Sequence, residues 1–330
     1  MTHTHTHTHI HVHMHTQAPT PVHTLVHALP HGIDLHCRVS GEAGRPVLLF
    51  LHGFPEAAFV WDELLTHFSQ PEHGGYRCVA PNMRGYAPSS VPTEVSDYRA
   101  KHLVQDICAL AAIESPTQPL AALVAHDWGG AVAWNVANQQ PACMQSLVIL
   151  NAPHPGTFLR ELQHSPAQQA ASAYMNFLIR PDAQALLQAD DYRRLWEFFT
   201  LMHAQDGPHA WLTPALEQRY RDSWQHGLQG PLNYYCASPL RPPHANDAAA
   251  NNVQLPESML HIGVPTCVIW GMQDTALHPA LLDGLSDHVP DLTVHRLPDA
   301  THWLVHEQPA QITQLIETFL QDIARRSGDQ

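Results

Sequence analysis

The chain has 330 residues, of which 44% are apolar and 14% charged, a composition typical of a globular protein with a filled core that excludes a disordered chain. Its length suits one large domain with an insertion, or two domains of ordinary size. The formal net charge is −14, and because an acidic chain without a basic run gains nothing from counterion release, we expect no nucleic-acid partner.

Residues 1–21 are predicted to be a disordered, histidine-rich tail. Residues 2–15 alternate histidine with threonine, isoleucine, valine or methionine. Alternating imidazoles can chelate divalent metal ions, but the tract has no acidic or cysteine partner to close a site, so only incidental metal binding is expected. The segment lacks the basic-then-apolar pattern of a secretory signal, and no apolar run approaches the roughly 20 residues of a membrane span. Six scattered cysteines without a CxxC pair fit a reducing compartment, so a cytoplasmic protein without membrane association is expected.

After the tail, strand patterns alternate with helix patterns. Continuous apolar runs, typical of central strands in a parallel sheet, occur at 46–51, 76–80, 120–125, 147–150 and 264–270. Two further β-rich stretches lie at 22–29 and 33–39, and a weaker alternating one at 292–297. Helical patterns occupy 57–68, 99–113, 128–139, 278–286 and 308–324. This alternation predicts an α/β protein whose mostly parallel, doubly wound sheet is flanked by helices.

Residues 152–250 interrupt this alternation. The interval carries amphipathic helical patterns rich in Trp, Tyr, Phe and Gln, punctuated by prolines, and shows no strand pattern. The simplest interpretation is a helical subdomain inserted into the core domain. The core would then consist of residues 22–151 and 251–330.

Asp127 lies where an apolar strand pattern meets a helix pattern, in the run Ala-His-Asp-Trp-Gly-Gly at 125–130. Reactive groups in open α/β sheets gather at the carboxyl ends of strands. Ala125 and Gly129 stand two residues to either side, which matches the small-x-nucleophile-x-Gly pattern of a nucleophile elbow. A carboxylate with a pKa near 3.9 is ionised at neutral pH and can attack an sp³ carbon, leaving an ester on itself. The plain alternative is a carboxylate that caps the following helix.

Hydrolysis of such an ester needs an oxyanion hole. The run His-Gly-Phe-Pro-Glu at 52–56 directly follows a predicted strand, where this kind of fold places an oxyanion loop. The N–H groups of Phe54 and Trp128 are therefore expected to stabilise the tetrahedral intermediate. The alternative for the loop is an ordinary strand-end turn.

The same hydrolysis needs a base and a group that orients it. Asp274 follows a buried strand pattern by a short glycine-containing turn and is expected to orient a histidine. Asn151, at another strand end, carries no charge to stabilise an imidazolium. One histidine among 28 means little by itself. However, the order Asp127, Asp274, His302 matches the nucleophile–acid–histidine order of α/β proteins that carry a nucleophile elbow. His302 is predicted to be the general base, with a pKa near 6.5 and mostly neutral at pH 7.

Taken together, these motifs resemble the α/β-hydrolase epoxide hydrolases. HGFPE at 52–56, Met-Arg-Gly-Tyr at 83–86, HDWGG at 126–130, Trp-Gly-x-x-Asp at 270–274 and Thr-His-Trp at 301–303 follow the order of that family, over about 25–325. The departures are Ala125 for the first elbow glycine and Ala87 where a glycine is usual, and both replace one small residue by another. The resemblance implies an α/β-hydrolase fold with a helical cap at 152–250, and no cofactor.

The resemblance also implies two cap tyrosines that hydrogen-bond the epoxide oxygen and protonate it. Tyr235 in Gly-Pro-Leu-Asn-Tyr-Tyr matches one of them better than Tyr234 does, and Tyr174 in Ser-Ala-Tyr-Met-Asn-Phe matches the other. Cap aromatics otherwise simply pack. The implied substrates are a small apolar epoxide and water, and the product is a vicinal diol.

Two other classes of function stay open at this point. A haloalkane dehalogenase would share the nucleophile and its histidine, but Phe54 in place of an asparagine after His-Gly and the tyrosine pair point away from it. A non-catalytic α/β-hydrolase-fold binding protein would not need all three triad residues, and a metal chaperone would rest on the tail alone. Deletion of residues 1–16 would abolish the chaperone function and leave a hydrolase unaffected. A homo-oligomer is compatible with the sequence.

Overall fold

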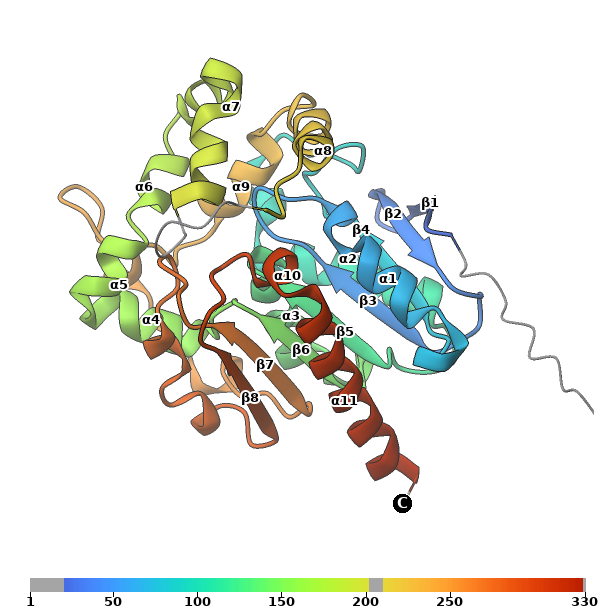
Figure 1. Cartoon of the computed structure of the whole chain (residues 1–330). Coiled ribbons are helices and arrows are strands. Elements are labelled where there is room, and N and C mark those ends of the chain that lie inside the picture. The colour runs from blue at the N-terminus through green and yellow to red at the C-terminus, as the bar shows by residue number, and fades with distance from the viewer. Residues whose placement is uncertain (1–20, 202–209, 329–330) are drawn as a thin grey trace, which may run out of the picture.

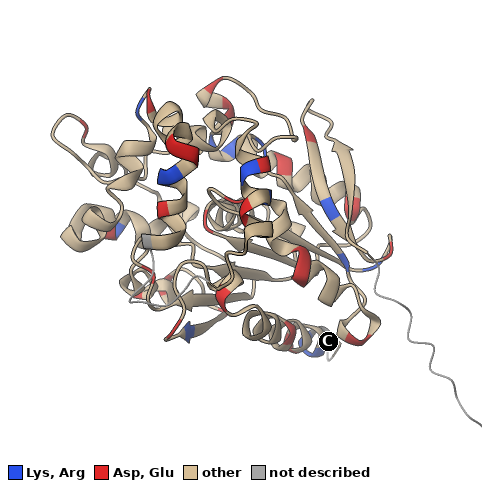
Figure 2. Ribbon diagram, turned by 45° about the horizontal axis from the view of Figure 1, so that its top comes forward, with Lys and Arg blue, Asp and Glu red and all other residues tan. Residues whose placement is uncertain are grey.

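The computed structural model describes residues 21–201 and 210–328 (Figure 1). Almost all of the predicted histidine-rich tail lies outside the described residues. Within the described ranges, no helix is long and apolar enough to cross a membrane. Figure 2 shows acidic and basic residues scattered over many elements.

An eight-stranded sheet in the order β1-β2-β4-β3-β5-β6-β7-β8 forms the centre of the molecule. The strands are β1 (His23–Ala28), β2 (Asp34–Ser40), β3 (Val47–Leu51), β4 (Arg77–Pro81), β5 (Ala122–His126), β6 (Leu147–Leu150), β7 (Thr266–Gly271) and β8 (Leu292–Leu297). Strand β2 pairs antiparallel with β1 and β4, and all other pairs are parallel. The predicted α/β fold with a mostly parallel sheet is confirmed.

Helices cover both faces of the sheet, which explains the continuous apolar strands. Successive side chains of a strand point to opposite faces. Leu48 and Phe50 of β3 pack with residues of α1 (Asp62–Phe68) and α11 (Pro309–Gly328). Leu49 packs on the other face with residues of α2 (Ala100–Glu114) and α3 (Trp128–Gln139). Every residue of β3, β5, β6 and β7 is buried as a result.

One predicted helix is wrong. Residues 278–286 form two 3₁₀ turns, η7 (Pro279–Leu282) and η8 (Leu285–Asp287), instead of an α-helix. Gly284 between them has φ 72°, a left-handed conformation that ends helical hydrogen bonding. The apolar pattern of this segment belongs to two short turns that bury leucines separately.

In the described residues, six α-helices lie between β6 and β7; in Figure 1, α6 to α9 lie above the sheet, and α4 and α5 lie to its left. They are α4 (Pro155–His164), α5 (Pro166–Ala171), α6 (Tyr174–Leu178), α7 (Ala183–Leu201), α8 (Pro214–Trp224) and α9 (Gln229–Ala237). Helix α7 is kinked at 189–192, where three consecutive residues have positive φ. Prolines begin α4, α5 and α8, where the missing N–H costs no hydrogen bond. We refer to these six helices as the cap.

Candidate active site

Asp127 lies at the sharp turn between β5 and α3. Its backbone has φ 50° and ψ −122°, a conformation that residues other than glycine rarely adopt. The turn passes so close to strand β3 that a Cβ at Gly129 would collide with the carbonyl oxygens of Leu51 and His52. The glycine predicted two residues after Asp127 is therefore required by backbone contact, and the close approach sets the carboxylate at the strand end.

The Asp127 carboxylate has one partner for each oxygen. Oδ1 accepts a hydrogen bond from the Phe54 N–H at 2.8 Å, and Oδ2 lies 3.5 Å from Nε2 of His302. Burial opposes ionisation, but His302 and the Phe54 N–H outweigh it, and the pKa of Asp127 is lowered from its ordinary value. The side chain is thus an anion at the base of a cavity.

Asp274 and His302 meet behind Asp127, although 28 residues separate them in the chain. His302 Nδ1 lies 2.7 Å from Asp274 Oδ2, and the other Asp274 oxygen accepts hydrogen bonds from the N–H groups of Ala276 and Leu277 at 2.8 and 2.9 Å. These bonds fix the carboxylate, so its Oδ2 accepts Nδ1–H and leaves Nε2 of His302 facing Asp127. The three residues predicted to act together lie in contact.

The ionisation of His302 differs from the sequence expectation of a mostly neutral imidazole near pKa 6.5. Burial favours the neutral ring, but the carboxylates of Asp274 and Asp127 outweigh it and raise the pKa of His302 to about 10. The sequence could not show that one imidazole lies between two carboxylates. In the free protein His302 is an imidazolium, ion-paired on both sides.

Asn151 has a part that the sequence analysis missed. It directly follows β6 with φ 37°, and its side chain is fully buried beside Asp274. Its Nδ2 donates to Asp274 Oδ2 at 2.6 Å, and its Oδ1 accepts from the Gly271 N–H at 2.7 Å. From the sequence, its lack of charge argues only against a role as the catalytic acid. An uncharged donor at this strand end in fact holds the acid in place.

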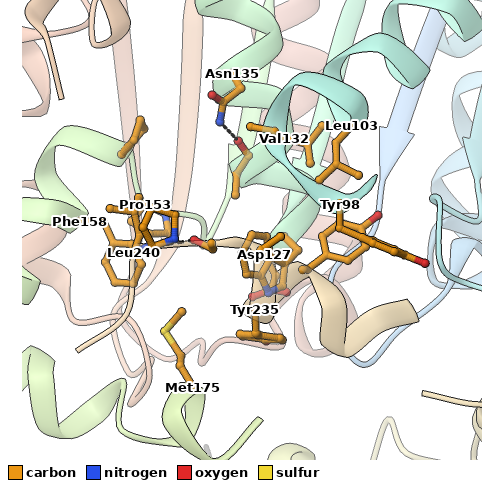
Figure 3. A pocket seen from close by; sticks show the side chains of 18 of the residues that line it. Tyr98, Leu103, Asp127, Val132, Asn135, Pro153, Phe158, Met175, Tyr235 and Leu240 are labelled. Atoms are coloured by element: carbon orange, nitrogen blue, oxygen red, sulfur yellow. Dashed lines mark hydrogen bonds between the residues drawn. The ribbon is translucent and has the colours of Figure 1, made fainter. Parts of the chain in front are cut away.

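Tyr174 of α6 and Tyr235 of α9 both line the cavity that contains Asp127. Their ring centroids lie 6.3 Å apart, and the Tyr235 ring also meets the edges of Phe54 and Trp128 at 5.3 and 5.1 Å. Figure 3 shows Tyr235 beside Asp127. Burial, followed by nearby groups that include Asp127, raises the pKa of both phenols, so both keep their protons at neutral pH.

Tyr234 and Tyr235 are distinguished by their hydroxyl partners. The Tyr234 hydroxyl donates to the backbone carbonyl of Arg84 at 2.7 Å, within the core. That hydrogen bond occupies its proton in holding α9 against the loop after β4. Tyr235 is therefore the better placed of the two to act on a bound molecule.

The cavity has a volume of about 280 Å³ and is lined by residues of both the core and the cap (Figure 3). Most of its wall is aromatic or aliphatic, including Leu103, Val132, Phe158, Met175 and Leu240. Asn135 of α3 adds a polar group, although its amide nitrogen donates to the Ala131 carbonyl at 2.8 Å. Such a wall suits an apolar ligand, and the ionised Asp127 meets it at one end.

A buried polar cluster joins the cap to the core beside the site. Glu56 is 1% exposed, and its Oε1 lies 2.6 Å from His306 Nε2 and accepts from the Tyr220 hydroxyl of α8 at 2.7 Å. His126 contacts both sides of the site, with Nδ1 3.4 Å from Glu56 Oε2 and Nε2 2.9 Å from the His302 carbonyl. Burial alone would raise the pKa of Glu56, but His306 and His126 outweigh it and lower the pKa. From the sequence, Glu56 is only the last residue of the His-Gly-Phe-Pro-Glu run, and nothing there indicates its contacts with Tyr220 and His306.

Comparison with known proteins extends these observations. Residues 46–309 match the family model described as alpha/beta hydrolase fold. A Bacillus subtilis (strain 168) protein, AB hydrolase superfamily protein YfhM, is 32% identical over 88% of this chain and 96% of its own length. Epoxide hydrolase 3 of Xenopus tropicalis is 30% identical over 91% of this chain and 78% of its own length.

Solved structures show the same similarity. An epoxide hydrolase of Bacillus megaterium in complex with an inhibitor superposes with a TM-score of 0.80 at 30% identity, covering 90% of this chain and all of the other. An epoxide hydrolase from metagenomes of hot environments gives a TM-score of 0.78 at 34% identity, covering 90% of this chain and 98% of the other.

Proposed function

Because the chain belongs to the epoxide hydrolases of the α/β-hydrolase fold, we propose that it opens small apolar epoxides to vicinal diols through a covalent ester on Asp127. The observation that carries this mechanism is the placement of two neutral tyrosines, Tyr174 and Tyr235, in the same apolar cavity as the ionised Asp127. An epoxide needs a nucleophile at carbon and an acid at oxygen, and residues of both kinds line this cavity.

In the first step, a carboxylate oxygen of Asp127 forms a bond to one epoxide carbon as the carbon–oxygen bond of the ring breaks. The oxygen that leaves the carbon takes a proton from Tyr174 or Tyr235, whose raised pKa values keep the protons available until charge develops on the substrate. The ester is uncharged, so His302 loses one of its two anionic neighbours. The imidazolium then becomes acidic enough to return a proton to the tyrosinate.

In the second step, neutral His302 removes a proton from water while the water oxygen bonds to the ester carbonyl carbon. The Phe54 N–H, which donates to Asp127 Oδ1 in the free protein, is positioned to stabilise the resulting oxyanion. The Trp128 N–H lies in the first turn of α3, where backbone donors have no partner within the helix. As the intermediate collapses, the bond between the former carbonyl carbon and the diol oxygen breaks. That oxygen takes the proton of the hydroxyl just added, which releases the diol and restores the carboxylate, while His302 keeps the proton from water as an imidazolium.

The decisive experiment traps the ester. His302→Gln would be incubated with a small aryl epoxide, and the intact protein would be weighed by mass spectrometry. We expect a stable gain equal to the whole epoxide, mapped by peptide analysis to Asp127, and no gain in Asp127→Asn. Turnover by Asp127→Asn equal to wild type would refute the mechanism. Halide release from a haloalkane, measured in parallel, would instead support the dehalogenase alternative.

A further inference from the structure

A cluster of three metal-ligating side chains lies outside the active site. His67 of α1, His73 at the end of the 3₁₀ turn η2 (Pro71–His73) and Glu317 of α11 place their ligand atoms within 4.8 Å of one another. None of the three lines the cavity that holds Asp127. Within residues 21–201 and 210–328, these are the side chains of at least three His, Cys, Asp or Glu residues that lie close enough together to hold one metal ion.

The distances within the cluster match those between ligands of one small cation. His67 Nε2 lies 3.3 Å from Glu317 Oε2, and His73 Nδ1 lies 3.2 Å from Glu317 Oε1. Ligands at about 2.0–2.2 Å from a tetrahedral zinc ion stand roughly 3.3 Å apart. The two imidazole rings are stacked, with centroids 3.6 Å apart, and the ligand atoms of all three side chains lie within 4.8 Å of one another.

The chemistry of the cluster also favours a cation. Within residues 21–201 and 210–328, the ion pairs of the Glu317 carboxylate are with these two imidazoles, so an ion would not have to displace an arginine or lysine there. The three side chains are each 25–31% exposed, which leaves the ion an entry path and room for water as further ligand. Imidazole and carboxylate ligands suit zinc and neighbouring divalent transition metals.

We propose that His67, His73 and Glu317 form a structural site for a divalent transition-metal ion, with zinc as the expected occupant. The ion would join α1 and η2 to α11, elements about 250 residues apart in the chain. It would stabilise the fold by binding the native state alone, since the unfolded chain does not hold these residues together. The proposal is independent of the hydrolase mechanism.

The alternating histidines at 3–15 would also bind added metal, so the test must separate metal binding by this tract from metal binding by the proposed site. The described region begins on the same face of the sheet, because Val22 packs against the apolar core that includes residues of α1 and α11. All variants would therefore be made in the full chain with the seven histidines of this tract changed to serine. Thermal unfolding would be followed with and without zinc, and cobalt binding by its visible absorption.

We expect zinc to raise the Tm by several degrees with saturation at one ion per chain, and EDTA to reverse the shift. Glu317→Gln should lose the shift and weaken zinc binding by at least about tenfold, since even loss of a group that only supports a ligand costs that much. His73→Phe should behave in the same way, because it keeps the stacked ring but supplies no nitrogen. Epoxide turnover should be unchanged in both variants.

Glu72→Gln is the matched control, since Glu72 is exposed in η2 next to His73 and is not part of the cluster. It should keep the zinc shift in full. Equal zinc responses in Glu317→Gln and Glu72→Gln would overturn the proposal. So would a cluster that responds to pH but not to zinc or cobalt, since this would show simple pairing of protonated histidines with Glu317.

Discussion

At the scale of single residues, the contacts of Asp127 maintain its negative charge inside a buried site. His302 and the Phe54 N–H lower its pKa despite burial. The same ion pair, together with Asp274, raises the pKa of His302 to about 10. In the proposed mechanism, formation of the ester removes the Asp127 charge, so the first half-reaction would itself convert His302 from an ion-pair partner into a base.

This coupling predicts different pH dependences for the two half-reactions. Formation of the ester needs only ionised Asp127 and neutral tyrosines, so its rate should be flat between about pH 5 and pH 9. It should fall at lower pH as Asp127 becomes protonated. Hydrolysis of the ester needs neutral His302. In the intermediate the Asp127 charge is gone, so the pKa of His302 should be lower than in the free protein, and the rate of hydrolysis should rise as the pH passes through that pKa. Single-turnover quenching followed by mass spectrometry measures both rates, and ester formation that follows one ionisation near pH 6.5 would contradict the scheme.

A second prediction concerns the tyrosines. Tyr235→Phe and Tyr174→Phe should each slow ester formation by about 10²-fold, because general acid catalysis to the departing oxygen is lost. Tyr234→Phe is the control, since its hydroxyl donates to the Arg84 carbonyl. It should lower the free energy of unfolding by about 1 kcal/mol and leave ester formation near the wild-type rate. A greater kinetic loss in Tyr234→Phe than in Tyr235→Phe would reverse the assignment.

At the scale of elements, the site depends on strand ends that bring distant residues together. Asn151 at the end of β6 bonds both to Asp274 and to the Gly271 N–H at the end of β7. Asn151→Ala should lower the free energy of unfolding by about 1–3 kcal/mol, because it leaves the buried Gly271 N–H without a partner. It should also slow hydrolysis of the ester, since Asp274 loses a donor.

Urea unfolding with single-turnover kinetics would check this prediction. Asn138→Ala provides the comparison, because its amide nitrogen bonds to the Ser258 and His261 carbonyls at an exposed position. Its loss of stability should be the smaller of the two, with no effect on hydrolysis. An Asn151→Ala variant as stable as Asn138→Ala would show that the hydrogen bonds of Asn151 contribute nothing net.

The sequence predicts the central strands well, because a strand buried on both faces of the sheet appears as a short continuous apolar run between turns. Strand β6 begins and ends at the residues predicted, because four consecutive apolar residues between turns leave no other register. The segment 278–286 fails because its leucines resemble one helix face, while Gly284 divides them into two turns. Asp127 could be found because backbone contact demands a recognisable set of small neighbours. Asn151 and the pKa of His302 could not, because both depend on contacts across the sheet.

At the scale of the whole molecule, cap and core meet at a buried carboxylate. Tyr220 of the cap and His306 of the core both bond to Glu56, which the contact with His306 and His126 keeps ionised. Glu56→Gln should lower the free energy of unfolding by about 1–3 kcal/mol at neutral pH, because it removes the buried carboxylate to which Tyr220 and His306 bond. Glu63→Gln on the exposed face of α1 should have little effect.

The sign of the pH dependence follows from the lowered pKa of Glu56. A lowered pKa contributes stability that is present above the unfolded value of about 4.3 and is lost as the pH falls through the folded value. The difference in stability between wild type and Glu56→Gln should therefore be full at neutral pH and shrink in strong acid. Urea midpoints measured across this pH range test the prediction, and a difference that grows toward low pH would contradict it.

The pairing of β6 with β7 across the inserted cap has a consequence for biosynthesis. Asp127 and its elbow leave the ribosome early, but Asp274 and His302 are made only after the whole cap. Until β7 emerges, β6 is an edge strand whose four apolar residues and backbone groups are open to other chains. A chain that stops before β7 would carry the proposed nucleophile without its proposed base, and its sheet would end in an unpaired edge strand. Translational pausing in the cap should therefore favour aggregation over partial activity.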